Sequence, residues 1–299
     1  LAAQSCGFGG FIPKDEARSI YGNGGIVAGT ARPIGRAVAH DDVFEVSGRW
    51  PFASGSSHAT WFAAECVIYD GEAKRLDADG NERTKMLFVP ASEVTVHDTW
   101  DTLGLRGTAS NDFSIEHATV PQIRGFQVLV DPPVHEWPLY RAEPLAFINH
   151  GAHALGLAKA ALDCAIEIAG KKQGWGGVTL NQTPRLQSAV AEASGVVGAA
   201  STYLYESSWA LWQQALSGET QKPLRATVRL ATSNAARASL QAVDLLHAAV
   251  GTSSIMASSP LSRILRDMHT ASAHVMIGSM TFEAAGRALM GLDAAFPFF

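Results

Sequence analysis

A histidine near the end of the chain has the residue type needed for acid–base or hydrogen-bonding chemistry. His274 follows Thr270 and Arg266 at four-residue intervals, so the three side chains share one face if the helix around them is unbroken. His269 then points elsewhere. An imidazole titrates near neutral pH and can either remove a proton from a hydroxyl or donate a hydrogen bond. A single histidine in an alanine-rich helix also fits a structural core position, and the spacing alone leaves both interpretations open.

A second candidate lies where a strand runs into a bend of small residues. Phe52 favours a strand, but Pro51 has no N–H to donate, so the strand ends or lies at a sheet edge there. Ala53, Ser54 and Gly55 add little bulk. They leave backbone groups and one hydroxyl accessible to a flat heteroaromatic ligand such as a flavin. The alternative is that Ser54 and Gly55 only close a hairpin.

A third candidate is a turn that carries a cation and hydroxyls. Arg106, Thr108 and Ser110 lie close together in the sequence, and Trp100 stands just before them. Such a turn can offer backbone N–H groups and a guanidinium to an anion. The alternative is that Arg106 forms a salt bridge with a neighbouring carboxylate.

The elements that must position these residues differ between the two halves of the chain. Between residues 26 and 126, short runs of valine, isoleucine, phenylalanine and threonine predict a compact β domain. Its predicted strands are 26–31, 43–52, 60–69, 85–89, 94–97 and 113–120. From residue 147 onward, helical spacing predicts four antiparallel helices. Three of them cover 149–171, 224–250 and 261–292. The remaining helix, second in the chain, presents an apolar face from Leu186 to Leu204.

Composition narrows the class of protein. The chain has 299 residues, of which 47% are hydrophobic and 17% are charged, and its net charge is −5. This composition indicates extensive burial between subunits or around a cofactor, and the absence of a dense basic run argues against a nucleic-acid partner. Three widely spaced cysteines argue against a disulfide framework and fit a reducing cytoplasm. We expect no metal site, no membrane span and no nicotinamide-binding glycine motif.

In chain order, the bend at 48–55, the turn at 103–112 and the segment from Arg266 and Asp267 to His274 together resemble the acyl-CoA dehydrogenase fold, and specifically its oxygenase branch, the group D flavin-dependent monooxygenases. The resemblance covers nearly the whole chain. It implies an α+β fold in which a central β-barrel domain is followed by a C-terminal four-helix bundle, with the N-terminal helical domain of the family largely absent. The implied parts are a remnant of that domain (1–24), the barrel (25–130), a linker over the pocket (131–146) and the bundle (147–299).

The resemblance also assigns roles to residues. His274 and Ser54 are implied as catalytic residues, with Ser54 beside flavin N5 in a pocket walled by Trp50 and Phe52. The implied flavin-binding residues are Thr30, Phe52, Ala53, Ser54, Trp100, Arg106, Ser110, Gly251 and Thr252, the last two acting from an adjacent subunit. Trp137 and Tyr140 are implied to wall the substrate pocket, although their proline-rich segment also fits a rigid linker.

The implied function is the oxygenase component of a two-component monooxygenase. It uses reduced flavin (FMNH2 or FADH2) from a separate flavin reductase, and O2, through a C4a-hydroperoxide to hydroxylate an aromatic or polycyclic substrate or oxidise a heteroatom. A homotetramer or homodimer is implied. The alternative is an acyl-CoA dehydrogenase-type flavoprotein that oxidises an acyl thioester, but its catalytic glutamate would fall at about Val275, which cannot accept a proton. A catalytically silent helical assembly protein is a further alternative.

Overall fold

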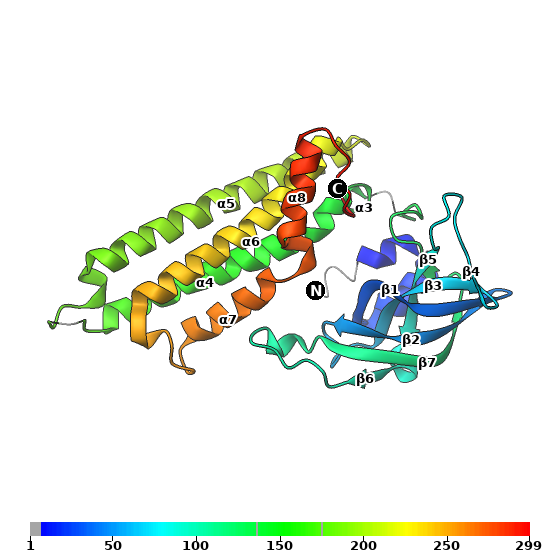
Figure 1. Cartoon of the computed structure of the whole chain (residues 1–299), viewed down its shortest axis with the longest axis horizontal. Coiled ribbons are helices and arrows are strands. Elements are labelled where there is room, and N and C mark those ends of the chain that lie inside the picture. Colours follow the sequence, from blue (N-terminus) through cyan, green and yellow to red (C-terminus); the bar gives the residue numbers. More distant parts are fainter. Residues whose placement is uncertain (1–6, 136, 175) are drawn as a thin grey trace. The chain divides into compact units, whose positions relative to one another are not determined.

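The computed structural model describes residues 7–135, 137–174 and 176–299. The chain divides into two compact units, which are described separately (Figure 1). The first, the β unit, contains residues up to Asp101 and again from Arg106 to Glu136. The second, the helical unit, contains Thr102–Leu105 and Trp137–Phe299. The short segment Thr102–Leu105 therefore belongs to the helical unit although its neighbours in sequence belong to the β unit.

A mixed sheet forms the β unit, in the order β6-β7-β2-β1-β3-β5-β8, with β4 paired to β3. Its strands are β1 (Val27–His40), β2 (Val43–Ala53), β3 (Trp61–Asp70), β4 (Ala73–Lys74), β5 (Thr84–Pro90), β6 (Thr95–His97), β7 (Asn111–Pro121) and β8 (Gly125–Phe126). Among these strands, only β1 and β3 pair in parallel. The predicted strand at 26–31 is too short. Strand β1 continues through Pro33, which a register shift between Thr30 and Gly35 accommodates.

Trp50 fixes the end of β2. It is fully buried, donates its indole N–H to the Glu65 carbonyl at 2.8 Å, and stacks on Phe113 with ring centroids 5.0 Å apart. A Cβ at Gly35 would lie 2.0 Å from the Trp50 ring, so the close approach of β1 requires glycine there. The expectation that Trp50 walls a pocket is wrong, because this side chain belongs to the core of the β unit.

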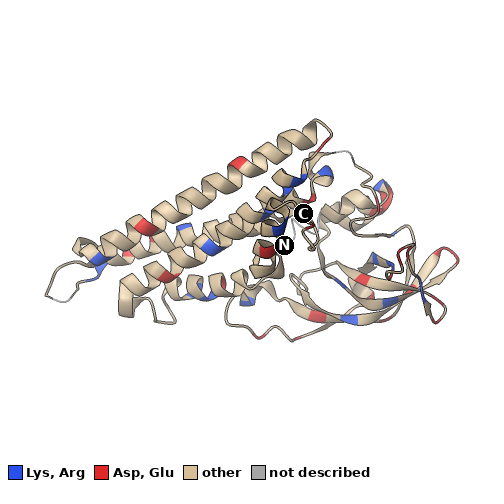
Figure 2. Ribbon diagram, turned by 45° about the horizontal axis from the view of Figure 1, so that its top comes forward, with Lys and Arg blue, Asp and Glu red and all other residues tan. Residues whose placement is uncertain are grey.

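Long alanine-rich helices build the helical unit (Figure 1). They are α3 (Pro138–Arg141), α4 (Ile148–Lys171), α5 (Pro184–Leu216), α6 (Lys222–Val250), α7 (Pro260–Ser272) and α8 (Ser279–Leu289). Proline lies in the first turn of α5, α6 and α7, where its missing N–H costs no hydrogen bond. Buried alanines such as Ala158, Ala161 and Ala242 let the helices approach closely. Charged side chains are sparse on the long helices (Figure 2), and no described helix is long and apolar enough to cross a membrane.

The predicted last helix, 261–292, is interrupted. Helix α7 ends at Ser272, a short 3-10 helix η8 (Val275–Ile277) follows, and α8 begins only at Ser279. His274 leaves the helix with extended backbone dihedrals (φ −66°, ψ 130°), and its side chain accepts the N–H of Met276. This side-chain cap satisfies a backbone donor at the start of η8 and so stabilises the break. His274 therefore does not share a helical face with Arg266 and Thr270, contrary to the expectation from spacing.

Candidate functional site

Two turns of the β unit interlock through hydroxyl groups. The Ser54 and Ser110 oxygens lie 2.6 Å apart, and the Ser110 and Thr108 oxygens lie 2.8 Å apart. The Gly55 N–H donates to the Thr108 carbonyl at 2.7 Å, which closes the pair. The bend after β2 and the turn before β7 therefore act as one structural unit, and the Ser54 hydroxyl is held by Ser110 and not left to rotate freely.

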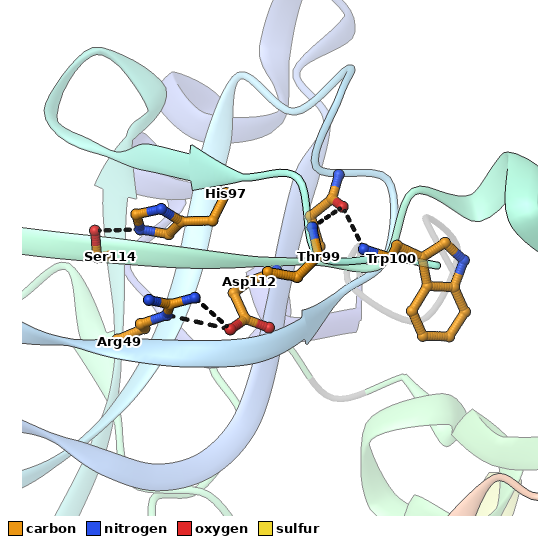
Figure 3. A network of polar contacts seen from close by, with 7 residues as sticks. Arg49, His97, Thr99, Trp100, Asp112 and Ser114 are labelled. Atoms are coloured by element: carbon orange, nitrogen blue, oxygen red, sulfur yellow. Dashed lines mark hydrogen bonds and ion pairs between the residues drawn. The ribbon is translucent and has the colours of Figure 1, made fainter. Parts of the chain in front are cut away.

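Asn111 fixes the loop that carries Trp100. Its side-chain oxygen accepts the N–H groups of Thr99 and Trp100 at 3.1 and 3.0 Å, and its amide nitrogen donates to Ser56 at 3.3 Å. The two bonds to the backbone nitrogens of Thr99 and Trp100 are drawn as dashed lines in Figure 3. The Trp100 and Phe52 rings form a T-shaped contact, with centroids 6.3 Å apart and nearly perpendicular planes. Sequence reasoning missed Asn111, whose only signal was a short polar side chain at the start of a strand.

Further ties on the same strands hold this network in place. Arg49 of β2 pairs with Asp112 at 3.0 Å, and His97 of β6 shares a hydrogen bond of 2.8 Å with Ser114 (Figure 3). The Asp112 N–H donates to the Thr99 hydroxyl at 2.8 Å. Strands β2, β6 and β7 are therefore tied to one another and to the loop residue Thr99.

The bend leaves an open surface that suits a flat ring with polar edges. Phe52 has φ 66° and its side chain is 55% exposed, with the Arg32 guanidinium 5.8 Å from its ring. A Cβ placed on Gly55 would meet no other atom within 4 Å. The aromatic rings of Phe52 and Trp100 can pack against a flat heteroaromatic ring, and the Ser54 hydroxyl can form a hydrogen bond with its polar edge. These residue types are compatible with a flavin.

Arg106 already has a partner. Its guanidinium lies 3.4 Å from the Asp101 carboxylate, and both side chains are exposed. The salt bridge that the sequence left as the alternative is therefore formed, and an exposed pair of this kind is weak enough to exchange for a bound anion. Thr30 lies half-buried on β1, just before its register shift.

The Arg-Asp pair of α7 anchors the segment Thr102–Leu105. The Asp267 carboxylate accepts the Leu105 N–H at 2.6 Å. A Cβ at Gly104 would lie 2.2 Å from the Arg266 carbonyl oxygen, so only glycine fits against α7. Arg266 and Asp267 therefore hold the backbone one residue before the Arg106 turn.

Two histidines and a buried arginine meet in the helical unit. The rings of His274 and His150, which lies on α4, have centroids 4.4 Å apart. Partial desolvation of the ring, reinforced by the charge of Arg229, lowers the pKa of His274, although the residue keeps an exposed surface. Burial and the neighbouring His274 and Arg229 lower the pKa of His150 to about 3. Both imidazoles are therefore neutral at physiological pH.

Arg229 of α6 is fully buried. Its guanidinium lies 4.7 Å from the Phe147 ring centre and 5.4 Å from that of Phe299, and one nitrogen donates to the Met276 carbonyl at 3.2 Å. Burial lowers its pKa to about 10, so it remains charged at neutral pH. Within the described part of the chain, its Nε and Nη1 atoms have no hydrogen-bond partner. Sequence reasoning missed both Arg229 and His150, because their burial follows from helix packing.

A third group of predicted residues lies at the far end of α6. Gly251 has φ 69°, and the Lys172 ammonium donates to the Val250 carbonyl at 2.9 Å and lies 3.5 Å from the Thr252 hydroxyl. Arg229 and Gly251 are 22 residues apart on the numbered chain, which corresponds to about 33 Å along a helix. Gly251 and Thr252 therefore cannot act beside His274 of the same chain.

Trp137 and Tyr140, the predicted substrate-pocket residues, differ in exposure. Trp137 is 70% exposed, and Tyr140 lies half-buried on α3. Within residues 7–135, 137–174 and 176–299, no cluster of histidine, cysteine or carboxylate side chains could hold a metal ion.

Comparisons with known proteins identify relatives along the chain. Residues 148–279 match the family model described as acyl-CoA dehydrogenase, C-terminal domain. Indole-3-acetate monooxygenase of Pseudomonas putida is 29% identical over 94% of this chain and 72% of that protein. The oxygenase component of the FADH(2)-dependent resorcinol hydroxylase of Rhizobium sp. (strain MTP-10005) is 28% identical over 90% of this chain and 69% of its own.

Solved structures agree in fold. XiaF from Streptomyces sp., in complex with FADH2 and glycerol, superposes with a TM-score of 0.87 at 24% identity, over 98% of this chain and 76% of that chain. Dibenzothiophene monooxygenase (TdsC) from Paenibacillus sp. A11-2 gives a TM-score of 0.76 at 18% identity, over 97% and 76%. These likenesses establish the fold.

Proposed function

We propose that, in this flavin-dependent monooxygenase of the acyl-CoA dehydrogenase fold, the β unit holds the ring of the reduced flavin. The helical unit supplies the imidazole that acts on the substrate. The observation that carries the proposal is the interlocked pair of turns that holds the Ser54 hydroxyl. Reduced flavin, when bound, supplies the electrons that activate dioxygen for insertion into the substrate.

The β unit protects the bound ring. In the proposal, the Ser54 hydroxyl accepts a hydrogen bond from the N–H at flavin N5, which keeps that proton on N5. Phe52 and Trp100 exclude water. Ala53 and Thr30 contribute backbone close to the ring. Arg106 and Ser110 belong to the same turn. Because the Arg106–Asp101 ion pair is exposed, a bound anion can replace Asp101 as the partner of Arg106.

His274 acts on the substrate from the helical unit. Its neutral imidazole can exchange hydrogen bonds with an oxygen atom of a small aromatic compound. The relatives are named for indole-3-acetate and resorcinol, so we propose an aromatic substrate of that size. Trp137 and Tyr140 line its pocket in this proposal.

A second copy of the chain completes the cofactor site. Gly251 and Thr252 lie about 33 Å along α6 from the His274 end, and Lys172 places a cation beside them. We propose that they bind flavin phosphates of a neighbouring subunit in a homotetramer or homodimer. Exposed aromatic side chains on α5, Tyr205 and Trp209, are each 61% exposed and suit a surface between copies. The oxygenase-component relatives imply a separate flavin reductase as partner, and we propose a cytoplasmic location.

Anaerobic titration with reduced FMN and with reduced FAD tests the proposal directly. We expect saturable binding of at least one of them, followed by hydroxylated product when oxygen and an aromatic test compound such as resorcinol or indole-3-acetate are added with a flavin reductase. Binding of reduced flavin without any oxygenated product across such compounds would contradict the oxygenase assignment. Tightly held oxidised FAD that bleaches on addition of an acyl-CoA would instead support the dehydrogenase alternative.

A further inference from the structure

The two ring nitrogens of His274 have different surroundings. Nδ1 lies 3.2 Å from the backbone nitrogen of Met276 and accepts its N–H. A backbone N–H can only donate, so Nδ1 must present a lone pair to it. A neutral imidazole carries one proton, which must then lie on Nε2. The fold therefore selects one tautomer of His274.

Arg229 stabilises this arrangement from α6. It donates to the carbonyl of Met276, the same residue whose N–H reaches the His274 ring. The guanidinium is fully buried and lies against the rings of Phe147 and Phe299, so it cannot follow a displaced segment. Arg229 therefore fixes the position of η8 and, through Met276, the orientation of the imidazole.

The charges around His274 favour the neutral ring. Among the described residues, the titratable groups that face it are His150 of α4, itself neutral, and the Arg229 cation of α6. In the described part of the chain, no carboxylate pairs with His274 to stabilise an imidazolium. A second proton would also have to enter on Nδ1, where the Met276 N–H already points.

We propose that His274 acts as a hydrogen-bond donor through its Nε2–H and not as a general base, and that Arg229 is the positioning residue that keeps it so. A base at Nε2 would need a lone pair there and hence a proton on Nδ1 opposite the Met276 N–H. A donor needs no proton transfer: the Nε2–H stays on the ring and is available to an oxygen atom of the substrate. This inference rests on the proposed function, in which His274 faces the substrate.

Paired substitutions distinguish the two roles. In His274→Gln the side-chain NH2 can reach the place of Nε2 and still donate, whereas in His274→Asn it reaches only the place of Nδ1. We expect His274→Gln to keep product formation within about tenfold of the unchanged chain and His274→Asn to lose about a hundredfold, the usual effect of removing one aimed donor. Equal, near-complete loss in both variants would overturn the donor role. His269, which pairs with Asp244 at 2.8 Å on the exposed side of α7, gives matched controls: His269→Gln and His269→Asn should both leave product formation unchanged.

The tautomer can be read without flavin or substrate. Two-bond proton–nitrogen correlation spectra of the full chain, labelled with nitrogen-15 histidine and assigned with His274→Gln, should show the Nε2–H form of His274 at neutral pH. In Arg229→Met we expect a mixture of tautomers and a raised His274 pKa; if that variant does not fold, the unchanged chain still decides. An Nδ1–H form would overturn the inference. This outcome is separate from failure of the proposed function, in which the Nε2–H form would be seen but no product would form.

Discussion

The two regions that carry the proposed chemistry differ in what they can do with a proton. The bend at Ser54 and the turn at Ser110 contact each other through hydroxyls and backbone groups. The region around His274 contains two imidazoles and a buried cation. The hydroxyls of the first region do not titrate near neutral pH, whereas the second region contains imidazoles, a side chain that can. Substitutions in each region should accordingly have different consequences.

The largest effect is expected at Gly104, in the segment Thr102–Leu105 that packs against α7. In Gly104→Ala the new methyl would lie 2.2 Å from the Arg266 carbonyl oxygen, so the segment Thr102–Leu105 must leave α7. We expect a loss of about 3 kcal/mol in the free energy of unfolding, measured by chemical denaturation. Gly107→Ala, three residues on, meets no atom within 4 Å and should stay within about 0.5 kcal/mol. Equal losses in the two variants would contradict the docking of this segment.

His150 of the helical unit should contribute to the pH dependence of stability. His150 has a folded pKa of about 3 and an unfolded value of about 6.5, so below pH 6.5 the unfolded chain binds the extra proton. The free energy of unfolding should therefore fall as pH decreases between these values, by up to about 1.4 kcal/mol per pH unit. In His150→Gln this slope should become shallower, as followed by denaturant titrations at several pH values. An unchanged slope would show that His150 is not buried in the neutral form.

Asp267 tests whether the Arg-Asp pair of α7 is an anchor. Asp267→Ala removes the carboxylate that accepts the Leu105 N–H and should cost about 1–2 kcal/mol. Asp267→Asn keeps a carbonyl oxygen at the same place and should cost less than half of that amount. Thermal unfolding of the two variants measures the difference. If both variants lose the same stability, the negative charge matters and the acceptor does not.

The smallest effect is expected at the exposed ion pair of the β unit. The Arg49 side chain is 54% exposed, and its 3.0 Å pair with Asp112 is screened by water. Arg49→Met should change the free energy of unfolding by less than about 0.5 kcal/mol, measured by denaturation at low and at high salt. A loss above about 1 kcal/mol would show that this pair, and not Asn111, holds the loop at Trp100.

The sequence predicted the β half of the candidate site better than the helical half. Pro51 and the small residues after it mark the bend at Ser54 locally, and local signals need no knowledge of the fold. The break at His274 depends on a side chain capping the next turn, which the regular apolar spacing hides. Arg229 and His150 are distant in sequence, so only packing shows their contact with His274.

Trp50 and Lys172 are two further residues whose surroundings the sequence alone did not predict. Trp50 was expected at a pocket wall because of its position beside the bend, but the glycine at position 35 opens space for it in the core. Lys172 carried no sequence signal for the Gly251 loop, since helices α5 and α6 separate the two in the chain. Long-range packing decided both cases.

Product yield per reduced flavin in Ser54→Ala tests the central claim most directly. The account predicts that this variant still binds reduced flavin but forms about a tenth of the hydroxylated product or less, with hydrogen peroxide making up the difference. The neighbouring and exposed Ser57 supplies the control, because Ser57→Ala should match the unchanged chain. If Ser54→Ala yields as much product per flavin as the unchanged chain, the Ser54 hydroxyl does not protect the bound ring and the account is wrong.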